Sequence, residues 1–177
     1  ENPVVSGNAV VIQGSEADDV ITVGFEDLAG DGTPDQVVVR VNGNPTDVTG
    51  YPEVIIQALS GDDHITVDPE VYNINGTTLS VLGGDPGDSD VLLMDHSLSF
   101  FTVRDYSVEY PPGVADDAGV VAENGIGFLA FAGIEKVQLV GNGDDTLELT
   151  DDFGDNTWEI GPGPAVLGDS VRSVIDD

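Results

Sequence analysis

Residues 14–23 read Gly-Ser-Glu-Ala-Asp-Asp-Val-Ile-Thr-Val, an acidic turn followed by a short apolar strand. Glycine and aspartate favour tight turns, whereas valine, isoleucine and threonine favour extended backbone. The phrase returns in residues 59–67 (Leu-Ser-Gly-Asp-Asp-His-Ile-Thr-Val) and 141–149 (Gly-Asn-Gly-Asp-Asp-Thr-Leu-Glu-Leu), and more loosely in residues 83–94. This repetition predicts an all-β fold built from one recurring unit.

A second apolar segment precedes each phrase, so the predicted unit is strand, acidic turn, strand. These preceding segments are residues 9–12, 53–58, 78–82 and 134–140. Alternation of apolar and polar residues predicts further strands in residues 36–42, 100–108 and 127–131.

Two architectures accommodate short strands separated by Gly/Asp turns. A parallel β-solenoid (β-helix-like) is favoured, because stacked units place equivalent turns one above another. An antiparallel β-sandwich is the alternative, because the second aspartates of the four phrases are 44, 27 and 55 residues apart, which is an uneven repeat. We expect a single β-rich domain over residues 1–177, with a possible boundary between two sub-blocks near residues 110–119.

The charge of the chain is strongly negative. Its 177 residues include 34 Asp and Glu against 4 Lys and Arg, which gives a formal net charge of −30. Such a chain is repelled by phosphate backbones and anionic lipid, so we expect no nucleic-acid partner and no membrane insertion. A hydrophobic content of 40% still supports a folded core, and the absence of cysteine excludes disulfides.

Aspartate accounts for 24 of the 34 acidic residues, and few cations are available to pair with them. Bound calcium ions would neutralise crowded carboxylates, since Ca²⁺ takes six to eight oxygen ligands from carboxylates, carbonyls and water. This composition is typical of secreted or cell-surface proteins, and that is the expected location. A salt-adapted cytosolic protein has a similar composition and is the alternative.

The acidic phrases resemble the hemolysin-type (RTX) calcium-binding repeat, in which G-G-x-G-x-D is followed by an apolar residue two positions later. The match is best at Gly141, Gly143, Asp145 and Leu147, and it is partial in the other phrases. Similar Gly-Asp-rich phrases occur in bacterial surface and matrix proteins. The resemblance and the neighbouring acids imply calcium ligands at Asp18, Asp19, Asp62, Asp63, Asp85, Asp88, Asp90, Asp144, Asp145 and Asp152.

A different acidic pattern occupies residues 27–35, Asp-Leu-Ala-Gly-Asp-Gly-Thr-Pro-Asp. It resembles the EF-hand-like loops of dockerins, with Asp27, Asp31 and Asp35 at ligand positions 1, 5 and 9. Ala29 stands where a third oxygen ligand is usual, and Val38 stands where the bidentate acid is usual. The resemblance implies a further calcium site that is weaker or is completed by residues from elsewhere.

No catalytic motif is recognisable, so we expect no enzyme. The basic residues are scattered, and no Ser/His/Asp order or phosphate-binding loop is present. The expected function is a calcium-stabilised extracellular structural protein: a surface, matrix or fibre subunit. It could form a homopolymer by strand addition or by end stacking of its terminal strands. A carbohydrate- or protein-binding adhesin module is one alternative, and a β-helix enzyme acting on polysaccharides is a second.

Overall fold

A computed structural model describes residues 3–27, 30, 35–84, 89–95, 105–109, 118–123, 126–140, 146–151 and 170–175. These residues form an all-β fold, as the sequence predicts, with one short helix, α1 (Glu70–Asn75). Among them, no helix has the length and apolar character needed to cross a membrane.

The strands form two mixed sheets. In spatial order, the nine-stranded sheet consists of β1 (Val4–Ser6), β2 (Ala9–Gln13), β6 (Glu53–Leu59), β8 (Thr78–Gly84), β12 (Ile126–Ala132), β11 (Gly119–Glu123), β10 (Asp105–Glu109), β14 (Thr146–Asp151) and β15 (Ser170–Ile175). The six-stranded sheet consists of β13 (Lys136–Val140), β9 (Val91–Asp95), β7 (His64–Val67), β3 (Val20–Glu26), β4 (Gln36–Val41) and β5 (Asn44–Asp47).

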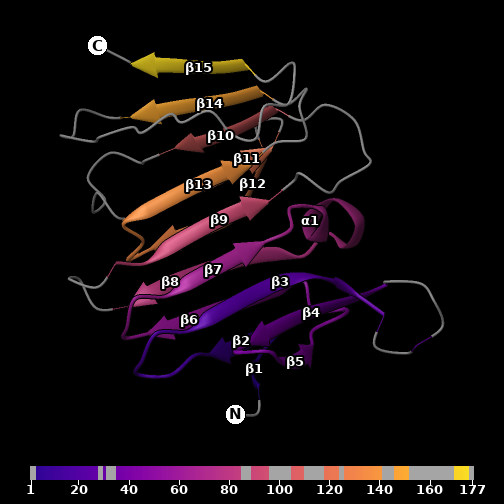
Figure 1. Cartoon of the computed structure of the whole chain (residues 1–177). Coiled ribbons are helices and arrows are strands. Elements are labelled where there is room, and N and C mark those ends of the chain that lie inside the picture. Colours follow the sequence, from indigo (N-terminus) through magenta and orange to yellow (C-terminus); the bar gives the residue numbers. More distant parts are fainter. Residues whose placement is uncertain are drawn as a thin grey trace.

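Four strand–turn–strand units are stacked in the middle of the fold, and we call them levels 1 to 4. They are β2–β3, β6–β7, β8–β9 and β12–β13. In each level the first strand belongs to the nine-stranded sheet and the second to the six-stranded sheet. Successive levels pair in parallel within both sheets. The turns that join the two strands of levels 1 and 2 consequently lie along one side of the molecule, at the left of Figure 1, with α1 at the right.

The remaining described elements lie between the levels or at the ends of the sheets. The β4–β5 hairpin separates levels 1 and 2, α1 separates levels 2 and 3, and β10 with β11 separates levels 3 and 4. The hairpin adds antiparallel pairs to one sheet, and β1, β10 and β11 add antiparallel pairs to the other. Neither a purely parallel stack nor an antiparallel sandwich therefore describes both sheets. The expected boundary near residues 110–119 falls mostly outside the described residues.

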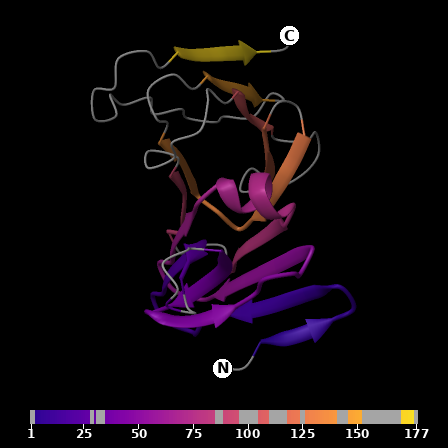
Figure 2. The ribbon, with the colours of Figure 1, turned by 90° about the vertical axis from the view of Figure 1, so that its right-hand side faces the viewer.

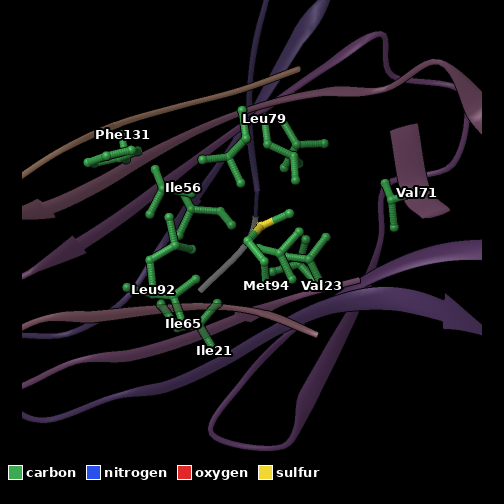
Figure 3. Packing of buried hydrophobic residues seen from close by; sticks show 14 of the residues in the cluster. Ile21, Val23, Ile56, Ile65, Val71, Leu79, Leu92, Met94 and Phe131 are labelled. Atoms are coloured by element: carbon green, nitrogen blue, oxygen red, sulfur yellow. The ribbon is translucent and has the colours of Figure 1, made fainter. Parts of the chain in front are cut away.

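The apolar faces of the two sheets form one core between them. Ile56 and Leu79 point into it from the nine-stranded sheet, and Ile21, Ile65 and Leu92 point into it from the six-stranded sheet (Figure 3). These side chains alternate with exposed or half-buried ones along each strand, for example in β6 and β7. The period-two pattern read from the sequence thus corresponds to the inward and outward faces of the strands. Figure 2 shows the two layers from the side that carries α1.

The turns are crowded where the chain leaves the nine-stranded sheet. A Cβ atom added to Gly83 would lie 1.7 Å from the carbonyl oxygen of Gly133 and 2.4 Å from Oδ2 of Asp90. At level 1, a Cβ on Gly14 would lie 2.5 Å from Oδ2 of Asp19. Glycine is required at these two positions because a carboxylate and the backbone of the next level occupy the space of a side chain.

Replacing Gly83 with alanine should therefore destabilise the protein. The new methyl group meets a backbone oxygen, which cannot move without shifting level 4, so we expect a loss of about 2 kcal/mol or more in the free energy of unfolding. Gly24→Ala is the matched control, because its Cβ would make only an ordinary 3.7 Å contact with Asp68 Cβ. Urea denaturation of both variants measures the difference, and equal losses would contradict the crowding at Gly83.

Candidate functional site: the stacked acidic turns

The acidic turns form a continuous column of hydrogen-bonded carboxylates, which we call the inner column: Asp19, Asp63, Asp90 and Glu135, one residue from each level. The backbone N–H of Asp19 donates to Oδ1 of Asp63 (2.7 Å), and the N–H of Asp63 donates to Oδ1 of Asp90 (2.8 Å). The N–H of Asp90 donates to Oε2 of Glu135 (2.8 Å). Each carboxylate therefore binds the backbone of the level before it.

The three aspartates of the inner column are almost completely buried, each with 1% of its surface exposed. Burying a carboxylate is unfavourable unless hydrogen bonds replace its water. A charged acceptor forms a stronger hydrogen bond than a neutral one, contributing roughly 1.5–3 kcal/mol. The inner column therefore stabilises the register between levels, because a slip of one residue would remove every one of these bonds.

Both carboxylate oxygens of Asp19 accept hydrogen bonds from the first acidic turn or the β4–β5 turn. Its Oδ2 accepts the backbone N–H of Ser15 (2.5 Å), and its Oδ1 accepts the Ser15 hydroxyl (3.2 Å) and the side-chain amide of Asn42 (2.5 Å). Asn42 also accepts the N–H of Val20 (3.0 Å) through its own Oδ1. Asn42 lies at the β4–β5 turn with φ of 51°, so this hairpin is fastened to the first acidic turn.

A second column runs along the outside of the turns, and we call it the outer column: Asp18, Asp62 and Ser89. Here the direction is reversed, since the N–H of Asp62 donates to Oδ1 of Asp18 (3.1 Å) and the N–H of Ser89 donates to Oδ1 of Asp62 (3.0 Å). All three residues are exposed. Beside them, the Ser60 hydroxyl donates to Oε2 of Glu16 (3.1 Å). The outer carboxylates therefore face solvent while their Oδ1 atoms join consecutive levels.

Asp63 differs from the other inner aspartates because its Oδ2 is buried and has no hydrogen-bond partner. At level 1 the backbone N–H of Ser15 donates a hydrogen bond to Oδ2 of Asp19. The corresponding residue of level 2 is Leu59, whose backbone has a positive φ of 84°. Burial raises the pKa of Asp63 from its ordinary value of 3.8 to about 6. The hydrogen bond from Asp19 N–H opposes this rise, and the negative charges of Asp90, Asp19 and Asp18 reinforce it.

The structure brings together five of the aspartates that were predicted to bind calcium. Asp19, Asp63 and Asp90 lie in the inner column, where their Oδ1 atoms accept N–H groups or hydroxyls, and Asp18 and Asp62 lie in the outer column. Asp27 accepts the N–H of Gly30 (2.6 Å), and Asp35 is exposed. The other predicted ligands lie outside the described residues: Asp31, Asp85, Asp88, Asp144, Asp145 and Asp152. Within the described part of the chain, no group of three or more His, Asp or Glu side chains has the geometry of a metal site.

The turn of level 4 is not formed by the acidic phrase of residues 141–149. Its turn is Gly133-Ile134-Glu135, in a segment predicted as strand from residue 134 onward, whereas β13 begins at Lys136. The strand that follows residues 141–145 is β14, which pairs with β10 and β15 in the nine-stranded sheet. In levels 1 to 3 the strand after the phrase enters the six-stranded sheet. The phrase with the best motif match therefore precedes a strand of the other sheet.

Sequence reasoning missed Glu135 and Asn42 as members of the acidic turns. Glu135 follows a glycine by two residues, which is a weak signal for a turn. Asn42-Gly43 is a strong hairpin signal, but its contact with Asp19 spans 23 residues and leaves no local pattern.

Comparison with known proteins adds no assignment: no family model matches the chain, and neither does any curated protein or solved structure.

The raised pKa of Asp63 predicts a pH dependence of stability. Because the folded state prefers the protonated form, Asp63 does not destabilise the fold below pH 3.8; its penalty grows as pH rises from 3.8 to about 6 and is constant above that. A rise from 3.8 to about 6 corresponds to about 3 kcal/mol of stability lost above that range. Asp63→Asn, which mimics the protonated acid, should be more stable than the wild type at neutral pH and equal to it near pH 4.

Denaturant unfolding of both proteins across this pH range measures the effect. Glu26→Gln serves as a control of opposite sign, because the hydrogen bond from Arg40 lowers the pKa of Glu26, so its stabilisation is lost as pH falls. A difference between the wild type and Asp63→Asn that does not change with pH would contradict the assignment to Asp63.

Proposed function

We propose that this chain is a non-catalytic structural module of a cell surface or extracellular matrix. The observation that carries this proposal is the inner column, in which the carboxylates of Asp63, Asp90 and Glu135 each bind the backbone of the preceding level. The feature that the four levels share is thus a connection between levels, as expected of a scaffold. The acidic residues of the turns are accounted for by hydrogen bonds without assigning them to a reaction.

We further infer that the stacked part of the chain belongs to the parallel β-solenoid class. The support is the parallel pairing of levels 1 to 4 in both sheets, with the turns of successive levels in register. The β4–β5 hairpin, α1 and the β10–β11 pair are then insertions between levels. They account for the uneven distances of 44, 27 and 45 residues between successive members of the inner column.

Calcium is the proposed stabilising ion, but the inner column does not fit a calcium cage. Its Oδ1 atoms already accept backbone N–H groups or other donors, and each aspartate is 1% exposed. Glu16, Asp18 and Asp62 are the better candidates for weak binding, because they are exposed and lie at adjacent levels, but they do not form a ready-made metal site. Calcium bound there would neutralise like charges that the stack holds close together, and it would stabilise the fold by mass action.

The proposed extracellular location is supported by the same chemistry. Weak, exposed carboxylate sites bind calcium in the range of about 0.1–1 mM, which is typical of extracellular modules. A chain of charge −30 with four basic residues also depends on cations to reduce its self-repulsion.

Calcium should therefore raise the melting temperature, and this experiment tests the proposed function. We expect a rise of about 5 °C or more in roughly 5 mM CaCl₂ relative to EGTA, since one or two kcal/mol corresponds to several degrees for a chain of this length. The variant Asp18→Asn/Asp62→Asn keeps both Oδ1 acceptors and should lose most of the rise. Differential scanning calorimetry measures the shift.

Two controls separate calcium binding from general screening. NaCl at matched ionic strength should give a much smaller shift, and MgCl₂ should give an intermediate one, because Mg²⁺ releases its water reluctantly. An equal shift in NaCl would support salt adaptation and would contradict the calcium proposal.

A further inference from the structure

The basic side chains that the structure describes lie on one face of a strongly acidic chain. Those whose surroundings the structure describes are Arg40, His64 and Lys136, and all three lie on the outer face of the six-stranded sheet. Their neighbours along the strands point inward: Val39 and Ile65 are buried, and Val137 packs against the core. Arg40 is paired with Glu26 on the same face, whereas Lys136 and His64 are exposed and make no ion pair within the described residues.

His64 and Lys136 occupy matching places in the stack. Each is the first residue of its strand, and the register His64–Val91–Lys136 sets them two levels apart in one row. Each is also flanked by an exposed turn carboxylate, with Asp62 two residues before His64 and Glu135 directly before Lys136. Levels 2 and 4 therefore both carry an acid in the turn and a basic group at the start of the strand.

This corner of the stack is complementary to itself. A two-fold axis parallel to the stacking direction, lying between the turns and the first strand positions, keeps every level opposite the same level of a second copy. Asp62 then faces His64 of the second copy, and Glu135 faces its Lys136. The symmetry makes each pair twice, which is the property of an isologous interface.

The residues of the other two levels fit the same contact. Val20 at level 1 is 58% exposed, and Val91 at level 3 is half-buried. Opposite them at the turn lie Asp18 and the uncharged Ser89. The row of first strand residues, Val20, His64, Val91 and Lys136, thus alternates apolar and basic residues. It contains no carboxylate, so no two carboxylates of the row face each other when a second copy approaches.

We propose that the chain forms a two-fold dimer through this corner, with the two stacks running parallel. This names the partner of the structural role proposed above and rests on it. A second copy fits better than another acidic protein, because it supplies carboxylates at the same two levels and with the same spacing between levels. Distant repulsion between two chains of charge −30 is screened at physiological ionic strength, where the Debye length is about 8 Å, while pairs in contact persist.

The dimer is tested by sedimentation velocity over a range of concentrations, in moderate salt without calcium, because calcium bound at Asp62 would compete with His64 of the second copy. Lys136→Glu places like charges opposite each other twice in the interface, and it should weaken association at least about tenfold. Lys136→Arg keeps the charge and should associate as the wild type does. Lys136→Met and Gln13→Glu change the net charge equally, but Gln13 lies on the nine-stranded sheet, so only the first should weaken association.

Cross-linking tests the pairing directly, because Lys136 is the single lysine of the sequence. A carbodiimide joins a lysine amine to a carboxylate in contact with it. In a mixture of isotope-labelled and unlabelled chains, we expect mixed-label peptides that join Lys136 to Glu135, and none from Lys136→Arg. A monomer at all concentrations would overturn the dimer, as would association that is insensitive to Lys136→Glu. A monomer that still melts higher in calcium would overturn the dimer alone and leave the proposed function standing.

Discussion

The hydrogen bond from a backbone N–H to the carboxylate one level further on is the interaction on which the stacked part of the fold depends. It occurs three times in succession, between Asp19 and Asp63, between Asp63 and Asp90, and between Asp90 and Glu135. It satisfies a backbone donor at the point where each turn becomes a strand, and it satisfies one oxygen of each accepting carboxylate as well. The crowding at Gly14 and Gly83 follows from it, because the carboxylates and the adjacent backbone fill the space where side chains would stand.

The sequence predicted much of this arrangement. Alternating apolar residues identified β2, β6, β7 and β8, and the Gly-Asp-Asp phrases identified the turns of levels 1 and 2. Those signals are local, so the all-β class could be predicted. The direction of strand pairing could not, because an inserted hairpin such as β4–β5 introduces antiparallel pairs without changing the period-two pattern.

The chemistry of the aspartates was harder to predict than their position. A calcium ion and a backbone N–H both bind carboxylate oxygens, so the pattern Gly-x-Asp is compatible with calcium binding and with a backbone hydrogen bond. Only the neighbouring level decides between them, and it lies 27 to 45 residues away in the sequence. For the same reason Glu135 was taken for a strand residue, and the unpartnered Oδ2 of Asp63 has no counterpart in the local sequence.

The segments that return the chain from one level to the next differ in kind, although the levels they connect are alike. One is a hairpin, one contains a six-residue helix, and one passes through two strands that widen the nine-stranded sheet. The segments on the side of the molecule that carries α1 thus differ from level to level, while the opposite side keeps the register. For protein engineering, the exposed end of α1 at Gly76 marks a position where a foreign segment can be displayed, provided that Val71 and Tyr72 of the helix keep their places against the core.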